Sequence, residues 1–562
     1  MINIRAISSL EKVMPKAKIT DFKAVKELKA AKGERVSFQV TLDRYDSNGV
    51  IARGESTLTF RSKLSKYITL SRVGYVPSML PCYPEGMPNR ITDDDYITKD
   101  PGLFPDVLFP VKKNETCTLG CITPLTYWVT VDLPEDIEAG KYSICFTAAT
   151  AKKDDSAKCR VVIDVKNVRV EKSDLIFTQW FHCDCIADYF GVKMMSEKHW
   201  KLIDAFIKTA ARTGITMLLT PLFTPPLDTA VGSERPTMQL IQAEKKGDKF
   251  IFDFSLLKRW VDICHKYGIE YFEMSHLFTQ WGVSYCPKII VKVDGKEERM
   301  FGWHTASDSP EYYDFLSQLL PLLTKNLEEW GIADKCYFHI SDEPKKGDDR
   351  PDFENYLKAK TFLKKYLSGY KMMDALSQVD FYDNGLVDYP VCCTNHIAPF
   401  MERDIKERWC YYCCSQGNLV ANRFFAMPSY RNRVSGVQFY TNDISGFLQW
   451  GFNFYYSAGA VHKIDPYSVS DGNQAWPSGD PYSVYPYENG AIESVRSVVF
   501  YEGLQDRMLL KALEKYIGKD KVKELVTDAV GEKLTFDNHP RTPDFLISLH
   551  DKVIDLLEQY GG

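Results

Sequence analysis

Residues 336–344 read Cys-Tyr-Phe-His-Ile-Ser-Asp-Glu-Pro, an apolar run that ends in two adjacent acids and a proline. A short buried run of this kind is typical of a strand in a parallel sheet, and Pro344 stops it. Seven further runs of the same type lie between residues 175 and 457. They cover residues 175–184, 215–222, 269–276, 370–377, 389–395, 409–415 and 446–457.

Amphipathic segments with helical spacing lie between these runs, most clearly at 196–214, 253–268 and 309–331. Eight strand–helix units in a row predict an α/β fold with a (β/α)8 barrel. A doubly wound open sheet is the alternative. The chain closes with helical patterns at 488–518 and 542–561, which predict C-terminal helices.

The first third of the chain has a different pattern, in which apolar and polar residues alternate with period two. The alternating segments are 34–45, 56–62, 126–134, 139–150 and 158–170. Short alternating strands separated by turn residues predict a β-sandwich. We therefore expect a β-sandwich domain over residues 1–172, and a catalytic barrel with a C-terminal helical extension over 173–562.

Composition and charge exclude several classes of function. A formal net charge of -5 over 562 residues gives no electrostatic footprint for nucleic acid, and no run approaches the length of a membrane span. The N-terminus has no secretory pattern, so we expect a cytoplasmic protein. The 15 cysteines form no paired CxxC motifs, which argues against a zinc site or disulfide framework and favours free thiols. The sequence does not indicate an oligomeric state.

In a barrel, catalytic groups come from the C-terminal ends of strands. Asp342 and Glu343 stand at the end of the fourth predicted strand, where two neighbouring acids shift each other's pKa apart. One acid can then stay protonated while the other is ionised, which is how a pair divides acid and base roles. The alternative is that Asp342 caps the following turn and Glu343 is a surface acid.

A retaining glycosidase of the common type needs a second carboxylate about 5–5.5 Å from the first. The last three predicted strands supply none, which leaves Asp184, Glu273 and Asp480 as candidates. A 2-acetamido sugar can supply its own nucleophile, its amide oxygen. Glu343 would then be the general acid/base and Asp342 would bind the amide N–H, with no metal or organic cofactor.

Candidate substrate-binding residues lie at strand ends and in the following loops. They are Trp281, Tyr412, Trp450, Trp476, Asp480, His182, Asp184, His276 and Asn395. Aromatic rings would wall a sugar pocket and the polar groups would bind hydroxyls. The alternatives are that the aromatic residues pack between barrel and helices, that Asp480 forms a turn, and that the two histidines have core roles.

The sequence resembles glycoside hydrolase family 123, the β-N-acetylgalactosaminidases. The resemblance lies in segments 338–344, 180–184, 476–482, 484–486, 492–496 and 502–506. It implies a β-sandwich and barrel, exo action with retention, and substrate assistance by Asp342 and Glu343. It also adds Tyr485 as a candidate substrate-binding residue.

We therefore expect an enzyme that releases terminal β-linked GalNAc from glycans or glycolipids through an oxazoline-type intermediate. Two alternatives stay open. One is a β-N-acetylhexosaminidase or other glycosidase with a second carboxylate, Asp184 or Glu273, as its nucleophile. The other is a non-catalytic carbohydrate-binding protein on the same scaffold.

Overall fold

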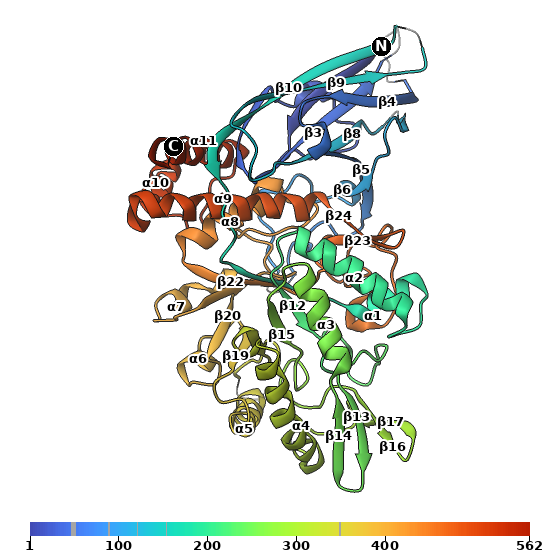
Figure 1. The fold of residues 1–562 in the computed structure, drawn as a ribbon, viewed down its shortest axis with the longest axis vertical. Coiled ribbons are helices and arrows are strands. Elements are labelled where there is room, and N and C mark those ends of the chain that lie inside the picture. Colours follow the sequence, from blue (N-terminus) through green and yellow to red (C-terminus); the bar gives the residue numbers. More distant parts are fainter. Residues whose placement is uncertain (46–51, 88–89, 121, 153, 348–349, 562) are drawn as a thin grey trace.

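Each of the eight predicted runs overlaps one strand of a closed parallel barrel (Figure 1). The protein is described by a computed structural model that covers the chain apart from residues 46–51, 88–89, 121, 153, 348–349 and 562. The barrel strands are β11 (Ile176–Gln179), β12 (Met217–Thr220), β15 (Tyr271–Met274), β18 (Cys336–Phe338), β19 (Lys371–Leu376), β20 (Tyr389–Cys393), β21 (Arg408–Tyr411) and β22 (Ile444–Gln449).

The strands follow chain order, and β22 pairs in parallel with β11, where Phe177 lies opposite Phe447. This closing pair confirms the barrel and excludes the open sheet. Alternate side chains point into the barrel, so that Trp409 and Tyr411 of β21 join the interior cluster while Cys410 packs outward.

Helices cover the barrel unevenly. The first crossover carries α1 (Cys183–Phe190) and α2 (Glu197–Arg212), and later ones carry α3 (Ser255–Lys266), α4 (Pro310–Glu329), α5 (Asp352–Leu363) and α8 (Ser429–Thr441). After β19 there is a single helical turn, α6 (Asp380–Asp383), and after β20 a 3-10 turn over Thr394–His396 and a single α-helical turn, α7 (Ala398–Met401). None of the described helices combines the length and apolar character needed to cross a membrane.

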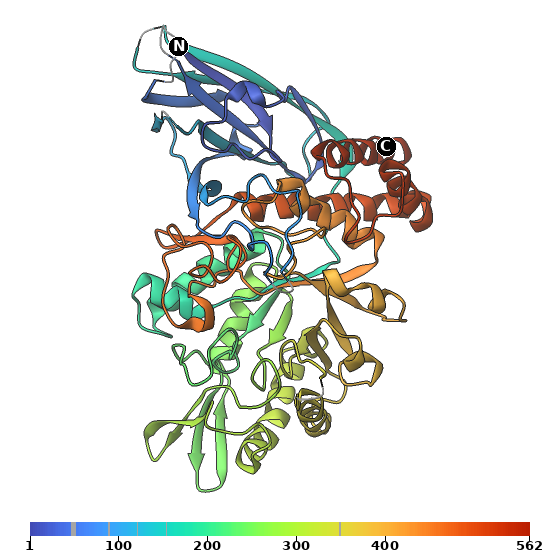
Figure 2. The same ribbon diagram turned by 180° about the vertical axis from the view of Figure 1, so that it is seen from behind.

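An additional four-stranded sheet grows out of the loops after β12 and β15, at the far end of the molecule from the N-terminus (Figures 1 and 2). The sequence analysis did not predict it. Its strands are β13 (Gln242–Lys246), β14 (Lys249–Asp253), β16 (Ile289–Val293) and β17 (Lys296–Phe301).

The N-terminal part is the predicted β-sandwich, made of two five-stranded sheets. The first holds, in spatial order, β1 (Ile2–Ser8), β3 (Arg35–Arg44), β8 (Leu125–Asp132), β5 (Ile68–Ser78) and β6 (Gly102–Pro110). The second holds β2 (Glu27–Lys32), β10 (Ser156–Arg169), β9 (Gly140–Ala149), β4 (Gly54–Arg61) and β7 (Thr116–Leu119). Phe38 and Phe146 meet edge to face between the sheets, with ring centroids 5.9 Å apart.

The predicted C-terminal helices are α9 (Val495–Ile517), α10 (Lys519–Val530) and α11 (Pro543–Gly561), and α8 and α9 lie between barrel and sandwich (Figure 1). A hairpin, β23 (Val484–Tyr487) and β24 (Gly490–Glu493), precedes α9. Helices α8 and α9 touch at two glycines. A Cβ on Gly436 would lie 1.7 Å from the carbonyl oxygen of Gly503, so only glycine permits this contact.

Buried charges join the sandwich to the barrel domain. Arg496 of α9 and Asp106 of β6 form a fully buried ion pair with contacts of 2.9 Å, and Arg496 also donates to the carbonyl oxygens of Gly479 and Tyr482. Lys12 donates through Nζ to the carbonyl oxygens of Phe425 and Met427, each at 2.7 Å. The sandwich therefore holds two loops at the C-terminal end of the barrel.

Candidate active site

A pocket opens at the C-terminal end of the barrel, where the strand ends and their loops converge. Its cavity volume is about 110 Å³. The residues that line it are Trp180, Asp228, Gln280, Trp281, Asp342, Glu343, Ala375, Tyr411, Cys413, Cys414, Leu448, Trp450 and Trp476. The pocket thus brings both predicted catalytic acids together with three of the predicted aromatic residues.

The acid pair is held by an extension of the barrel sheet beyond β18. The backbone N–H groups of Leu277 and Phe278 donate to the carbonyl oxygens of His339 and Ile340, at 3.3 and 3.0 Å. Trp281 continues the series with a 3.0 Å bond from its N–H to the carbonyl oxygen of Asp342. These bonds fix the backbone of the acid pair.

Both acids line one pocket although neighbouring side chains of an extended chain point to opposite sides. The reason lies at Glu343, whose φ of 43° is in the left-handed region. This conformation costs a residue with a side chain about 1–2 kcal/mol. Asp228 and Trp281 also have positive φ, at 41° and 59°, so strained backbone gathers at the pocket wall.

The Asp342 carboxyl is buried, and burial together with the neighbouring charge of Glu343 raises its pKa well above the usual range. The Tyr411 hydroxyl donates to Oε1 of Glu343. The general-acid role is predicted for Glu343, whereas the raised pKa favours the protonated form of Asp342. A hydrogen-bond donor that stabilises ionised Asp342 is therefore needed before Glu343 becomes the acid of the pair.

A buried charge network lies beneath the pair. His339 is hydrogen-bonded through Nδ1 to Asp374 and through Nε2 to Glu273, both at 2.7 Å. Burial alone would lower the pKa of His339, but the two carboxylates outweigh it and raise this pKa to about 10. The imidazolium charge in turn opposes the rise in the pKa of Asp342.

Neither predicted alternative nucleophile reaches the pocket. Glu273 is fully buried and accepts hydrogen bonds from Thr178 and Trp180, both at 2.6 Å, besides the one from His339. Asp184 lies in the first turn of α1 and accepts hydrogen bonds from Nε and Nη2 of Arg235, both at 2.8 Å. These contacts occupy the oxygens of both carboxylates, so both residues have a structural role.

Aromatic rings wall the pocket on the side of β22. Trp450 and Trp476 meet edge to face with ring centroids 5.0 Å apart, and the Trp450 indole N–H donates to Asp480 at 2.8 Å. Asp480 is fully buried, and burial, partly offset by Arg423, raises its pKa to about 7. Asp480 thus orients Trp450 instead of lining the pocket.

Four other predicted binding residues lie outside the pocket lining. His182 bonds to the carbonyl oxygen of Trp450 and to Arg235, each at 3.1 Å. His276 is buried and stacks on His339 with ring centroids 4.2 Å apart. Tyr485 is buried and donates to Asp106 at 2.5 Å. Asn395 is exposed and accepts from Gln416 at 3.0 Å.

The structure places Tyr411, instead of the predicted Tyr412, in the pocket. Alternate side chains of β21 point in and out, so a difference of one residue moves a tyrosine to the other side of the barrel wall. Tyr412 is buried against Phe447, with ring centroids 4.9 Å apart, beneath α8.

Sequence reasoning also missed Asp228, Gln280 and the thiols of Cys413 and Cys414, which line the pocket. Asp228 and Gln280 lie in loops with no periodic signal. Trp180 could have been found, because it directly follows β11 at the strand end where barrel chemistry is expected.

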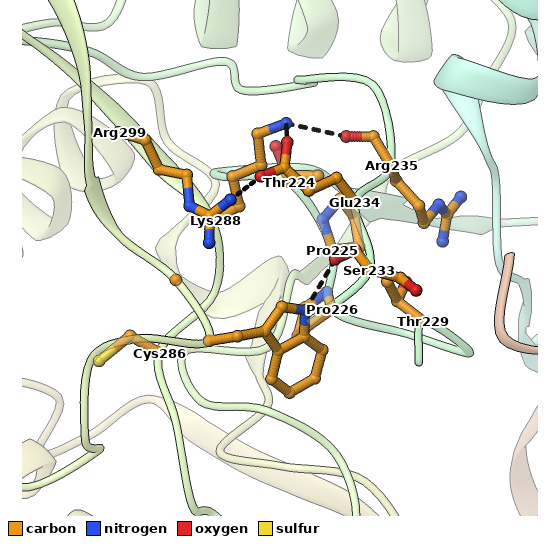
Figure 3. A pocket seen from close by; sticks show the side chains of 12 residues that line it. Thr224, Pro225, Pro226, Thr229, Ser233, Glu234, Arg235, Cys286, Lys288 and Arg299 are labelled. Carbon is orange, nitrogen blue, oxygen red and sulfur yellow. Dashed lines mark hydrogen bonds and ion pairs between the residues drawn. The ribbon is translucent and has the colours of Figure 1, made fainter. Parts of the chain in front are cut away.

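Figure 3 shows a second, smaller hollow beside the loop that carries Asp228. Lys288 donates to Glu234 at 3.1 Å there, and Arg299 also pairs with Glu234. Its volume is about 20 Å³, and neither acid of the pair lines it. It is too small for a sugar ring.

Among the described residues, His276, His339 and Asp374 lie close enough to hold a metal ion. However, both ring nitrogens of His339 are already bonded to carboxylates, and all three residues are buried beneath the pocket. This arrangement is that of a charge network and does not fit an open metal site.

The catalytic-domain model of glycoside hydrolase family 123 matches residues 180–513. A family 123 glycoside hydrolase from Clostridium perfringens, studied for glycolipid glycan hydrolysis, superimposes with a TM-score of 0.72 at 14% identity. The match covers 100% of this chain and 98% of that chain. A β-glucuronidase from Bacteroides uniformis gives a TM-score of 0.31 at 11% identity, over 81% of this chain and 47% of that one. Among curated proteins, none matches the sequence.

Proposed function

This chain belongs to glycoside hydrolase family 123, and on that premise we propose that it is a retaining exo-β-N-acetylgalactosaminidase acting by substrate assistance. The observation that carries the proposal is the adjacent pair Asp342 and Glu343, which line one tryptophan-walled pocket. Terminal GalNAc of a glycan or glycolipid is the substrate that we infer.

In the first step, the acetamido oxygen of the sugar attacks the anomeric carbon as the glycosidic bond breaks. Glu343 gives its proton to the leaving oxygen, and Asp342 accepts a hydrogen bond from the acetamido N–H. The positive charge that develops on the oxazoline ring then faces an ionised Asp342. Water next attacks the same carbon as the bond between this carbon and the oxazoline oxygen breaks and restores the acetamide, while Glu343 takes the proton of the water, which gives net retention.

The raised pKa of Asp342 fits this sequence if binding moves the proton within the pair. The acetamido N–H stabilises the ionised form of Asp342, so the single proton of the pair passes to Glu343. The Tyr411 hydroxyl donates to Oε1 of Glu343, so it lies where it can adjust its hydrogen bond when Glu343 gains the proton.

The first test is hydrolysis of an aryl β-GalNAc glycoside by the wild type and by Glu343→Gln. We expect Glu343→Gln to lose about 10²–10⁴-fold in kcat, as for loss of a general acid/base. Glu532→Gln, at an exposed position between α10 and α11, is the matched control and should keep full activity. A fully active Glu343→Gln enzyme would refute the assignment, and an inactive wild type would favour a binding protein.

The mechanism is tested separately with a thiazoline analogue of the sugar, which should inhibit strongly. Asp342→Asn should lose about 10²–10³-fold in kcat, because it removes charge stabilisation in the transition state, while substrate still binds. A two-carboxylate mechanism is the alternative, since the pocket holds a third acid, Asp228. A fluorosugar that labels a pocket carboxylate covalently, with no inhibition by the thiazoline, would establish that alternative.

A further inference from the structure

Asp228 and Gln280 form a linked pair on the pocket wall. The backbone N–H of Asp228 donates to Oε1 of Gln280 at 2.9 Å, and Gly459 donates through its backbone N–H to Oδ2 of Asp228 at 3.2 Å. The two residues come from the loops after β12 and β15 and hold each other in place. Both line the pocket.

Each residue leaves one polar group unused. Nε2 of Gln280 is buried without a hydrogen-bond partner, although only 7% of this residue is exposed. Among the described residues, none donates to Oδ1 of Asp228. A buried donor without a partner costs free energy, and a ligand in the pocket can recover it.

We propose that Asp228 and Gln280 bind the C3–C4 hydroxyl edge of the sugar and so determine specificity. This inference rests on the function proposed above. A sugar hydroxyl both donates and accepts, and the pair offers one carboxylate acceptor beside one amide donor. The C3–C4 edge follows from position: Gln280 precedes Trp281, whose N–H bonds to Asp342, where the C2 acetamido group binds.

The role of a hydroxyl-binding acid differs from that of a nucleophile in a way that can be measured. The pKa of Asp228 is raised by burial to about 6, so this carboxyl is ionised at neutral pH and can accept a strong hydrogen bond. A nucleophile acts on every substrate alike, whereas a hydroxyl-binding group matters only when the hydroxyl is present.

The experiment measures kcat/KM for an aryl β-GalNAc glycoside and its 3-deoxy and 4-deoxy analogues. The enzymes are the wild type, Asp228→Asn and Gln280→Leu. Sites built to bind a hydroxyl reject the analogue without it strongly, so we expect the wild type to lose at least about 100-fold on one deoxy substrate. In either variant the same deletion should cost less than about 10-fold, because the partner is already gone.

Gln559→Leu, exposed on α11, is the matched control for the loss of an amide and should keep the wild-type penalties. A melting temperature for each variant shows that it is folded. If Gln280→Leu fails to fold, Asp228→Asn alone decides. Deoxy penalties that stay at wild-type size in the variants would overturn the inference.

Two further outcomes separate this inference from the proposed function. If the wild type cleaves the parent glycoside in a Glu343-dependent way but the penalties do not shrink, only the hydroxyl assignment fails. If Asp228→Asn loses equally on all three substrates and a fluorosugar labels Asp228, this residue is a nucleophile, and both proposals fail. An inactive wild type that binds no thiazoline refutes the proposed function, and the hydroxyl assignment that rests on it fails as well.

Discussion

Replacing His339 with glutamine should destabilise the protein in a way that depends on pH. In the wild type, His339 lies fully buried between Glu273 and Asp374, and its pKa rises from the ordinary value of 6.5 to about 10. At about 1.4 kcal/mol per pKa unit, this difference corresponds to about 4–5 kcal/mol of stability. Burial also raises the pKa of Asp374, which offsets part of this value. We expect a loss of about 3–5 kcal/mol, as for a broken buried ion pair.

The direction of the pH effect follows from the raised pKa of His339. Below pH 6.5 the imidazole is charged in both the folded and the unfolded state, so its contribution is complete. As the pH rises from 6.5 towards 10, the unfolded state is already neutral and the contribution is lost. The difference in unfolding free energy between the wild type and His339→Gln should therefore shrink over this range.

Urea unfolding followed by tryptophan fluorescence at pH 6, 8 and 10 measures this difference. His462→Gln, at an exposed position after β22, is the matched control and should unfold like the wild type at each pH. A deficit of the same size at pH 6 and pH 10 would show that His339 contributes by packing and neutral hydrogen bonds, and would refute the charge argument.

Three other predictions follow from the site and its supports. The alkaline limb of the kcat/KM profile should lie above pH 4, the usual range of an aspartate, because it marks loss of the single proton of the pair, which Asp342 holds in the free enzyme with a raised pKa; a limb at or below pH 4 contradicts this. Tyr411→Phe should lower kcat/KM about 10–100-fold through Glu343, whereas Tyr412→Phe should change it by less than about 3-fold; equal changes of kcat/KM in the two variants would contradict a specific role of Tyr411. Arg496→Met should cost about 3–5 kcal/mol, measured by calorimetry, because it leaves the buried charge of Asp106 without its cation; an unchanged melting temperature would contradict this.

The barrel could be predicted from sequence because each strand is a short run buried on both faces, bounded by helical segments. The incomplete outer layer could not, since the loops after β19 and β20 have the length for helices but form only short turns. The extra sheet over residues 242–301 was not predicted, because its strands lie within the connections after β12 and β15. They therefore fall outside the regular alternation of barrel strand and helix.

The place of the two acids in the pocket could be predicted because position and composition agree at one strand end. Most of the polar binding candidates could not be placed, because their partners are remote in sequence. Asp184 is neutralised by Arg235, and Tyr485 bonds to Asp106 of the sandwich. Tyr411 and Tyr412 differ only in strand register, which a run of apolar residues does not specify.

Lys12 and Asp106 give the β-sandwich a direct part in the shape of the pocket at the C-terminal end of the barrel. Lys12 holds the loop before α8, and Asp106 holds Arg496, which anchors the loop carrying Trp476. Burial lowers the pKa of Lys12 to about 7. Removing the first 172 residues would leave the guanidinium of Arg496 without Asp106. The loop that carries Trp476 would then lose its support. The sandwich and the barrel are thus expected to unfold in a single thermal transition. A barrel transferred to another module without the sandwich would be expected to lose the shape of this pocket.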